Sequence, residues 1–367
     1  MSITPYLRGG AVLCLCLLTL GLSAQRRDYF PFFQQEYWFG HLPGARAEAM
    51  GRADVAVGNS VTSRFYNPAG IGLIEDWEAD LTTSAPYYLA RNADFYFAGY
   101  AKRLHPKLVA ALSVHQLAIG PTGFTVDIAG DDYPLDKPTS ATLTATVAAE
   151  VVPGLQVGVN ANYYRMKFFD DVRAFGSVFL DAGALYSRKL SNDAEIRAGV
   201  GVSNATFGEI AFESPTGIED DNVFPVTARG GVSYLQDFTI EIPGAGRQPL
   251  ALLLTTEYQN LLNFQYRTAF KVGGELTLAE VLALRLGYYT RDEQDFGVAN
   301  NRGRVHDFTY GFGFIIPLGR LSEGKLPFAL HLDYYSLENP PLVFSAQRGP
   351  NKRGFALRLV SDLSHLR

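Results

Sequence analysis

Residues 155–164 read LQVGVNANYY, and this stretch decides the fold class. Apolar Leu155, Val157 and Val159 alternate with polar or small residues at the even positions. Because successive side chains of a β-strand point to opposite faces, the stretch predicts a strand with one apolar and one polar face. The same alternation recurs in residues 196–203 (IRAGVGVS) and 282–289 (LALRLGYY).

Runs of this kind, each followed by a turn, continue along the chain and give about fourteen candidate strands. An even number is typical of a bacterial outer-membrane barrel, in which both chain ends lie on one side. The predicted fold class is therefore an all-β membrane protein, an antiparallel transmembrane β-barrel of about 14 strands over residues 77–367. The strands are expected to begin near Trp77, Asp94, Leu108, Thr139, Leu155, Arg173, Ala194, Phe224, Pro249, Thr268, Val281, His306, Pro327 and Arg353.

The connections alternate in length, as expected for short periplasmic turns and longer extracellular loops. The expected periplasmic turns are residues 105–107, 152–154, 190–193, a few residues around Leu278, and two longer ones at 236–248 and 318–325. The expected outward loops are residues 120–138, 205–222, 291–305 and 338–352. A soluble sandwich or propeller shows the same alternation of side chains, and the lengths of the strands and loops favour the membrane barrel.

Aromatic pairs give a second indication of a membrane boundary, where amphipathic rings prefer to lie. The alternative is the ordinary preference of tyrosine for strands. The pairs expected to form an outer girdle lie at positions 87–88, 163–164, 168–169, 288–289 and 334–335.

The N-terminus predicts an exported protein. Arg8 precedes an apolar stretch at residues 11–22, and Ser23-Ala24 precede Gln25, which is typical of a cleavable signal peptide over residues 1–24. The apolar stretch is shorter than the roughly 20 residues of a membrane-spanning helix; the alternative is a buried N-terminal helix. Both cysteines, Cys14 and Cys16, lie inside it, so the mature chain has no disulfide or thiolate site.

Composition and motifs exclude several classes of function. The net charge of −5 becomes −6 without Arg8, and no basic run indicates nucleic-acid binding. The six histidines are scattered without zinc-ligand spacing. Gly311-Phe312-Gly313 lies in a strand pattern, so it is not a nucleotide fingerprint, and no Gly-x-Ser-x-Gly elbow occurs. We expect no catalytic residues, no metal site, no cofactor and no enzymatic activity.

Residues 25–76 do not have the strand pattern. An aromatic-rich stretch at 29–39 is followed by GARAEAMGRADVAVG at 44–58 and by SRFYNPAGIGL at 63–73. This combination resembles the N-terminal hatch of the FadL and PorV-like (PorV/PorQ family) outer-membrane proteins. Arg52 stands where a second glycine is common, and Gly58-Asn59-Ser60 replaces the usual acidic pair. The plug motif carried by the resemblance comprises Gly44, Ala45, Arg46, Met50, Gly51, Asn67, Pro68, Ala69 and Gly70.

Further matches to this group lie in residues 224–234 (FPVTARGGVSY), in 271–275 (KVGGE) and in 282–288 (LALRLGY). The resemblance implies a 14-stranded barrel with an N-terminal plug. The residues agree with a rigid plug, because Pro68 fixes its own φ and restricts Asn67, and small residues allow close packing.

Strand parity places nine charged residues on the lumen face. Both signs occur together, which favours a salt-bridge network that holds the plug, since buried charges need partners. The alternative is an arginine that binds a substrate carboxylate. The nine are Arg197, Arg229, Glu257, Lys271, Glu275, Arg285, His331, Asp333 and Arg358, and partners are expected from Arg46, Glu48, Arg52, Asp54 and Arg64.

Acidic clusters lie in the expected outward loops. Grouped carboxylates can bind divalent cations that bridge lipopolysaccharide, and the alternative is a plain solvated loop. The clusters are Asp131-Asp132, Asp136, Glu219-Asp220-Asp221 and Asp292-Glu293-Asp295.

Two functions follow from the resemblance. A FadL-like protein is a passive channel for hydrophobic small molecules such as long-chain fatty acids. A PorV-like protein is an accessory or cargo-shuttle subunit of type IX protein secretion, and its partners are secretion components or cargo proteins. The sequence shows no long extracellular helical hairpin, which favours the PorV-like function. Either function places the chain in a Gram-negative outer membrane, in contact with lipid and lipopolysaccharide.

Overall fold

The structure is a computed structural model. It describes residues 42–84, 93–119, 125–128, 131–134, 139–167, 175–206, 209–213, 219–223, 225–244, 246–262, 268–294, 302–337 and 352–361. The predicted signal peptide and residues 25–41 lie outside these ranges. No helix among the described residues is long and apolar enough to cross a membrane.

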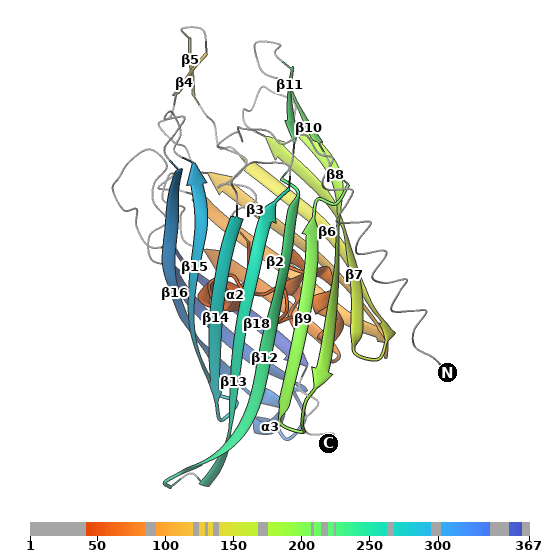
Figure 1. The fold of residues 1–367 in the computed structure, drawn as a ribbon, viewed down its shortest axis with the longest axis vertical. Helices are drawn as coiled ribbons and strands as arrows, with labels where there is room; N and C mark the ends of the chain where they lie inside the picture. The colour runs from red at the N-terminus through yellow and green to blue at the C-terminus, as the bar shows by residue number, and fades with distance from the viewer. Residues whose placement is uncertain are drawn as a thin grey trace.

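Fourteen antiparallel strands among the described residues close into a barrel, because β1 pairs with both β2 and β18 (Figure 1). The alternation of apolar and polar residues in each strand gives the sheet its two faces. The barrel strands are β1 (Trp77–Ser84), β2 (Ala93–His105), β3 (Leu108–Ile119), β6 (Thr139–Val152), β7 (Leu155–Lys167), β8 (Phe175–Lys189), β9 (Ala194–Ser203), β12 (Thr227–Ile242), β13 (Gly246–Leu261), β14 (Thr268–Leu278), β15 (Leu282–Gln294), β16 (Arg302–Ile316), β17 (Phe328–Leu337) and β18 (Lys352–Ser361).

The predicted fourteen-stranded barrel is confirmed. The strand starts agree closely with the sequence pattern, and the largest difference is at β16, expected near His306 and found from Arg302. The last strand, expected near Arg353, pairs with β1 in a register that places Arg358 opposite Asp80. This pairing closes the barrel.

The turn expected at residues 236–248 is wrong. β12 continues to Ile242 and β13 begins at Gly246, and the two strands pair along their whole length. The alternation of Phe238, Ile240 and Ile242 with polar residues continues the strand pattern through this stretch. The hairpin extends beyond its neighbours, since β9 pairs only as far as Gln236 and β14 only from Leu250 (Figure 1).

The opposite end of the barrel carries two small hairpins, β4 (Thr125–Ile128) with β5 (Asp131–Pro134), and β10 (Glu209–Glu213) with β11 (Glu219–Val223) (Figure 1). They lie within two of the connections that were expected to be long loops. At the other end, α3 (Leu318–Leu321) lies between β16 and β17. Long connections at one end and short turns at the other agree with the predicted alternation.

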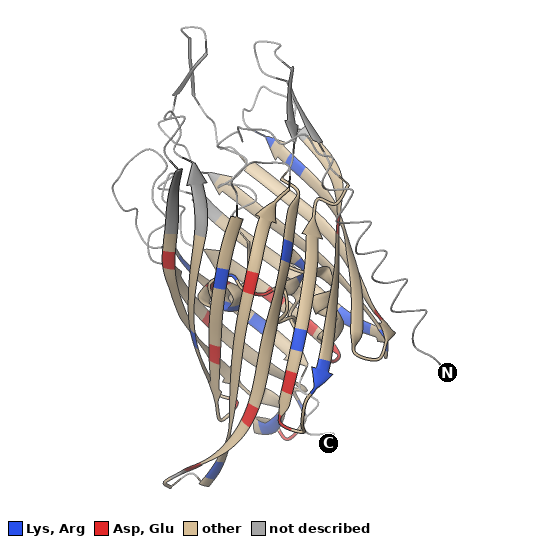
Figure 2. Ribbon diagram, in the orientation of Figure 1, with Lys and Arg blue, Asp and Glu red and all other residues tan. Residues whose placement is uncertain are grey.

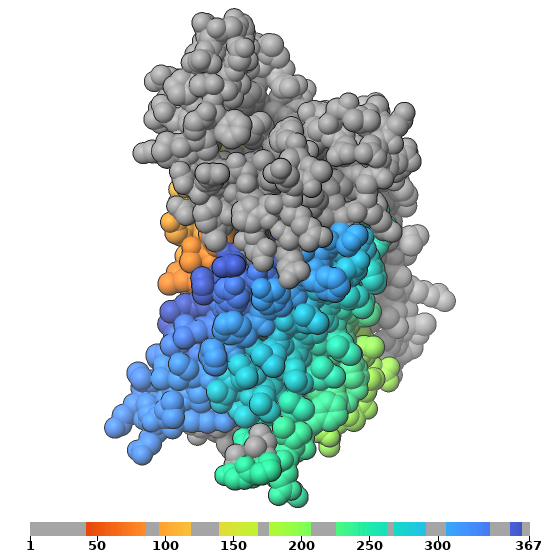
Figure 3. All heavy atoms as spheres, turned by 90° about the vertical axis from the view of Figure 1, so that its left-hand side faces the viewer, coloured from red at the N-terminus to blue at the C-terminus, as the bar shows by residue number. Residues whose placement is uncertain are grey.

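The outer face of the barrel is apolar. Leu112, Val178 and Leu286 are 63%, 66% and 64% exposed, and uncharged positions dominate the strands (Figure 2). On the face seen in Figure 3, side chains of the later strands form a continuous surface. An exposed apolar belt of this kind is what a transmembrane barrel presents to lipid.

The expected girdle of aromatic pairs needs correction. Tyr163 is 51% exposed while Tyr164 is buried, and Tyr289 and Tyr335 are buried as well. Successive strand residues face opposite ways, so only one ring of each pair can face lipid. The pairs at 87–88 and 168–169 lie outside the described residues.

The core of the molecule lies inside the barrel. Residues 42–76, here called the inner segment, cross the lumen and comprise α2 (Ala45–Ala49) and the 3-10 helices η3 (Val61–Phe65) and η4 (Pro68–Leu73) (Figure 1). Among residues 42–74 only Asn59 is exposed. The described strands therefore surround the inner segment.

Candidate functional site

Asn67 fixes the turn in the middle of the inner segment. Its side-chain oxygen accepts a hydrogen bond from the backbone N–H of Ala69 at 3.1 Å, and Pro68 begins η4. An Asn cap followed by proline at the first position is a favoured start of a helix. The Asn67 amide also donates to the carbonyl oxygens of Val55 and Ala184, both at 2.9 Å. One side chain thus joins η4, the preceding loop and strand β8.

The residues expected to form the plug motif all lie in the inner segment. Gly44 and Gly51 have positive φ angles of 119° and 68°, which glycine adopts without strain. Gly51 lies between the backbones of β14 and β15, where a Cβ would lie 2.7 Å from the carbonyl oxygen of Val272. Arg52, which replaces a common glycine, also has a positive φ of 64°. The backbone therefore explains why glycine is usual at that position.

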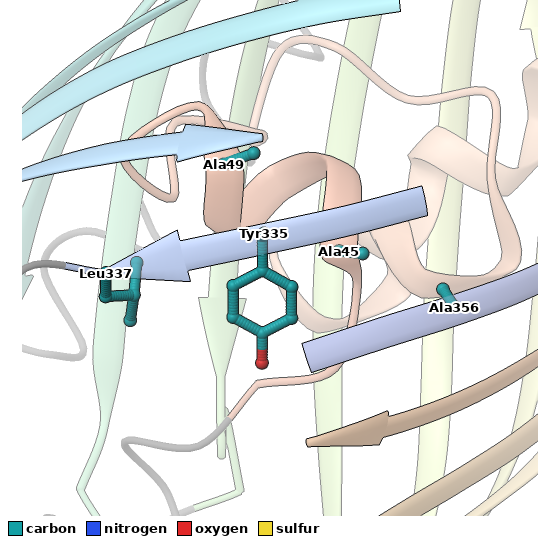
Figure 4. Close-up of a cluster of buried hydrophobic side chains, with 5 residues drawn as sticks. All are labelled: Ala45, Ala49, Tyr335, Leu337 and Ala356. Carbon is teal, nitrogen blue, oxygen red and sulfur yellow. The ribbon is translucent and has the colours of Figure 1, made fainter. Parts of the chain in front are cut away.

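Small residues let α2 approach the wall closely. Ala45 and Ala49 pack against Tyr335 and Leu337 of β17 and Ala356 of β18 (Figure 4). The Met50 side chain packs against Val57 and Leu253 in a separate cluster. These contacts fill the space between the segment and the later strands.

Inward glycines of the barrel receive the backbone of the inner segment directly. A Cβ on any of them would collide with the segment, so its backbone lies against the strand backbone. The glycines and their backbone neighbours are Gly158 with Pro68 and Ala69, Gly199 with Val55, Gly201 with Tyr66, Gly273 with Met50, and Gly287 with Gly51. Gly183 instead makes room for the Asn67 side chain.

A first ion-pair cluster lies on β12, β13 and β14. Glu257 accepts hydrogen bonds from the backbone N–H groups of Asp54 and Val55, both at 3.0 Å. Lys271 Nζ lies 2.6 Å from the Glu257 carboxylate, and Arg229 Nε lies 3.7 Å from it. Because all three side chains are buried, the carboxylate holds both the segment and its neighbouring cations.

A second cluster runs from the inner segment across β14, β15, β17 and β18. Arg46 contacts Glu275 at 2.7 Å, and Arg285 contacts the same carboxylate at 2.6 Å. Arg285 also contacts Asp333 at 2.6 Å, and Arg358 contacts Asp333 at 3.0 Å. These contacts form an unbroken chain from α2 to the closing strand.

The remaining two predicted lumen charges lie at the edges of this network. His331 Nδ1 lies 3.3 Å from Arg358 Nη2. Arg197 is separate from the others: it pairs with Glu195 at 2.7 Å and donates to the carbonyl oxygen of Val57 at 2.6 Å. All nine residues therefore lie on the lumen side: seven belong to the two clusters, His331 contacts the second cluster through Arg358, and Arg197 is separate.

Among the charged residues of the segment, Arg46 contacts Glu275 through its side chain. Asp54 contacts Glu257 through its backbone N–H. Arg52 pairs instead with Glu48 within the segment, at 3.1 Å. Burial raises the pKa of the Asp54 carboxyl to about 7 and lowers the pKa of the Arg64 guanidinium to about 9.

Sequence reasoning missed four buried carboxylates at inward strand positions among the described residues, Glu78, Asp80, Asp181 and Asp307. Two of them accept hydrogen bonds from the inner segment or from β7. Glu78 accepts from Ser60 Oγ at 2.8 Å and from the Val61 N–H at 3.0 Å. Asp181 accepts from the amides of Asn160 and Asn162 at 2.8 Å and 2.9 Å. The same alternation that identified the other nine places both residues on inward positions, so the signal was present.

Around η3, the strands β2, β3, β6 and β7 contact the segment without charged side chains of their own. At the end of the segment, by contrast, Arg103 of β2 donates to the carbonyl oxygens of Gly72, Ile74 and Glu75, and Lys102 of β2 pairs with Asp76. Asn160 donates to the carbonyl oxygen of Arg64 at 3.0 Å, and Thr146 donates to Asn160 at 2.8 Å. Phe65 lies edge-to-face with Phe97 of β2 and His115 of β3, at ring-centroid distances of 5.6 Å and 5.3 Å. This side of the lumen is thus lined by amides, hydroxyls and rings.

The structure offers no metal centre in the described part of the chain, since no group of three or more His, Cys, Asp or Glu residues there is arranged to hold an ion. Asp131, Asp132 and the Glu219-Asp220-Asp221 cluster lie in the end hairpins, with Asp132 opposite Asp127. Asp292 and Glu293 lie at the end of β15, whereas Asp136 and Asp295 lie outside the described residues.

Comparisons with known proteins show the fold. No family model matches the chain, and no curated protein matches it. A FadL homologue from Pseudomonas aeruginosa is similar in structure, with a TM-score of 0.51, 12% identity, and coverage of 87% of this chain and 98% of that chain.

Two toluene transporters give weaker likenesses. TbuX of Ralstonia pickettii has a TM-score of 0.49, 11% identity and coverage of 87% of this chain and 98% of that chain. TodX of Pseudomonas putida has a TM-score of 0.42, 11% identity and coverage of 92% and 98%. The likeness to the FadL homologue agrees with the FadL-like fold expected from the sequence, and it does not support the PorV-like role that the sequence favoured.

Proposed function

We propose that this chain is a non-enzymatic outer-membrane channel for hydrophobic small molecules. Residues 77–367 form the barrel, and residues 25–76 form the plug that closes it. The apolar outer belt and the FadL-like fold support a place in the outer membrane. Signal-peptide cleavage after residue 24 and contact with lipopolysaccharide belong to the same proposal.

The observation that carries the proposal is the position of the inner segment. It crosses the lumen with its backbone against inward glycines on several strands, and its charged residues pair with the wall. A solute passes only when part of the segment moves. The protein is therefore a gated channel rather than an open pore.

The two sides of the lumen suggest where a hydrophobic molecule passes. The ion pair between Arg46 of the segment and Glu275 of β14 is costly to separate in a site with little water, whereas the Asp76–Lys102 ion pair with β2 is partly exposed. Ring contacts between Phe65, Phe97 and His115 separate when side chains rotate, and they present an apolar surface. We place the path on the side of β2 and β3.

The secretion role that the sequence favoured is not proposed further. The FadL motifs and the FadL-like fold favour uptake of small molecules, and no feature of the described residues favours a cargo protein over such a solute.

Two disulfides that pin the plug test the proposal. Ala69 and Leu185 pack in one buried cluster, and Phe65 and Phe97 are in ring contact, so each pair is replaced by cysteines. The glycines Gly158, Gly201 and Gly287 are unsuitable partners, because a side chain there would displace the segment.

Uptake of radiolabelled toluene and oleate is measured in cells that lack other channels for them. We expect each oxidised double-cysteine protein to take up less solute than its own reduced form, a comparison in which any effect of the replaced side chains is the same on both sides. Equal uptake by the oxidised and reduced double variants would refute a moving plug. Failure of the wild type to take up either solute would refute the channel.

A further inference from the structure

One hairpin of the barrel projects beyond its neighbours at the end with the short turns. β12 pairs with β9 only as far as Gln236 and continues to Ile242, while β13 pairs with β14 only from Leu250. Residues 237–249 are here called the projecting hairpin (Figure 1). A ribbon of only two strands is marginally stable in water, so a third strand added to it would stabilise it.

The β12 edge of the projecting hairpin offers unpaired backbone groups. The Asp237 N–H donates to the carbonyl oxygen of Asp193 at 2.8 Å, on the side of β9. Because the backbone groups of alternate residues point the same way, the N–H and C=O groups of Thr239 and Glu241 point to that side too. These groups have no hydrogen bond within the described residues. A row of such groups is a template for another strand.

The β13 edge of the same hairpin is blocked. Pro249 has no N–H to donate, and its carbonyl oxygen already accepts a hydrogen bond from Ala279 at 2.7 Å. Proline is a common device that stops a sheet edge from pairing with another strand. The β12 edge has no proline at residues 237–242 and no bulge in its pairing with β13. The hairpin therefore blocks one edge and leaves the other open.

Acidic side chains lie along the open edge. Asp237, Thr239 and Glu241 share one face of β12, and all three are exposed. Asp193, whose carbonyl oxygen marks the start of the open edge, is exposed as well. Arg247 lies opposite Glu241 on β13, and the two form no ion pair within the described residues. A strand that joins this edge thus meets negative charge on one face.

The other face of the open edge is apolar. Phe238 and Ile240 alternate with the acidic residues, and the Phe238 side chain is 46% exposed. Opposite residues of neighbouring strands contact each other directly. The edge therefore fits an extended segment in which basic and apolar side chains alternate.

A second copy of this chain does not fit the edge. In the antiparallel register that pairs Thr239 with its own counterpart, Asp237 would lie opposite Glu241, and like charges in that position are destabilising. In addition, two barrels inserted the same way have β12 strands that run in the same direction, so this register is closed to them. The charges favour a different chain.

We propose that the β12 edge of the projecting hairpin binds an extended segment of a periplasmic protein by strand addition. That segment carries Lys or Arg opposite Asp237 and Glu241, and apolar residues beside Phe238 and Ile240. In this mode of recognition the main-chain hydrogen bonds supply affinity, and the alternate side chains supply specificity. The inference goes beyond the proposed channel and shares with it only the orientation in which the short turns face the periplasm.

Binding of two synthetic peptides to the purified full-length mature protein tests the proposal. The probes are acetyl-Lys-Val-Thr-Val-Lys-amide and its charge-reversed form, acetyl-Glu-Val-Thr-Val-Glu-amide, titrated by calorimetry at low salt. We expect the basic peptide to bind at least about fivefold more tightly than the acidic one, since it gains two ion pairs where the other gains two repulsions.

Substitutions on the two edges locate the site. Thr239→Pro removes a donor of the open edge and leaves the pairing of β12 with β13 in place, and Arg247→Pro does the same on the β13 edge. We expect Thr239→Pro to weaken binding of the basic peptide by about threefold to tenfold, and Arg247→Pro not to weaken it. Asp237→Lys/Glu241→Lys should reverse the preference between the peptides, whereas Glu323→Lys, at an exposed acid of the same end, should not.

The opposite results are equally defined. No binding of either peptide, or equal weakening by the two proline variants, would overturn the edge site. A wild-type dimer in ultracentrifugation that Thr239→Pro dissociates would overturn it as well, because a second copy would then occupy the edge. Toluene uptake by the same variants separates this inference from the channel: uptake without peptide binding counts only against the edge site, and peptide binding without uptake only against the channel. Heat-modifiable mobility checks folding, and Asp237→Lys/Glu241→Lys decides if Thr239→Pro does not fold.

Discussion

The inner segment meets two different walls of one barrel. On β13–β18, here called the charged wall, Glu257 holds it through backbone hydrogen bonds and Glu275 through an ion pair with Arg46. On β2, β3, β6 and β7, here called the uncharged wall, amides, hydroxyls and rings hold the part of it around η3. Cations of this second wall, Lys102 and Arg103, contact only the last residues of the segment.

The difference between the contacts on the two walls explains how one segment can be anchored on one side and able to move on the other. A buried ion pair is expensive to break because each charge is left without a partner, which fixes the segment on the charged wall. Separating packed rings leaves no charge without a partner, so the segment can move away from the uncharged wall more easily. Substitutions on each wall test this contrast, and the largest effect on stability is expected on the charged wall.

The largest effect is expected at Glu275. Glu275→Ala leaves Arg46 and Arg285 without this carboxylate, and breaking a buried pair costs about 3–5 kcal/mol. The temperature at which the folded band disappears in heat-modifiability gels should fall sharply. Glu280→Ala, which removes an exposed pair with Arg320, is the control and should cost at most about 1 kcal/mol. Equal shifts in the two variants would contradict the anchoring role.

The second effect is expected on the lipid-facing side of β7. Val159 is 45% exposed on the outer face, and arginine there should cost about 2–4 kcal/mol if it lies near the midplane. Val151, beside the turn at the end of β6, is the control, since arginine near the interface costs about 0–1 kcal/mol. Barrel folding into vesicles, followed by the same gel shift, measures both.

Arginine at position 160, on the inner face of the same strand, should be tolerated no better than arginine at position 159. Asn160 is fully buried and bonds to Arg64, Thr146 and Asp181, so the lumen has no room for arginine there. The parity of the strand is as expected, but its inner face is a packed interior rather than a wet channel lining.

A third prediction tests close backbone contact on the charged wall. Gly287→Ala puts a methyl group against Gly51 and Met50, and overpacking of this kind costs about 1–3 kcal/mol. Gly274→Ala is the matched control, because its Cβ would meet Leu254 at an ordinary 3.5 Å. Limited proteolysis should cleave the segment faster in the first variant only. Similar cleavage rates would mean that the segment is not seated there.

The smallest effect is expected at Arg64. Arg64→Met removes a buried charge that has no ion pair among the described residues. The free energy of unfolding should therefore fall by at most about 1 kcal/mol, or rise. Arg285→Met, which breaks two ion pairs, is the contrast. A large loss of stability in Arg64→Met would show that the uncharged wall depends on that cation in the unliganded protein.

Much of the fold could be predicted because one physical signal repeats. Side-chain alternation fixes both the strand and its inward face, which is why the strand starts and the side of Arg285 or Asp333 agree with the structure. The hairpin of β12 and β13 was misjudged because Pro249, Gly244 and Gly246 read as turn residues, whereas two of them continue paired strands.

The pairings of the site could not be predicted in the same way. The resemblance to a plug makes Arg64 and Arg46 candidates for the lumen, but it does not say which carboxylate each one meets. That depends on how the inner segment folds across the barrel, for example on the Asn67 contacts to Val55 and Ala184. Contacts between distant parts of a chain leave no periodic trace in a single sequence.

The chain of ion pairs from α2 to the closing strand also has a consequence for assembly. Arg46 and its partner Glu275 are 229 residues apart in the chain, and contacts of such long sequence separation form late. Arg46, near the start of the mature protein, is therefore neutralised only when Glu275, in the last third of the chain, has reached the barrel. Because the segment precedes β1 directly in the chain, it is present before the last strands pair, and the sheet can close around it. Sealing of β1 against β18 and capture of the segment then become a single late event, in which Arg358 takes part from the final strand.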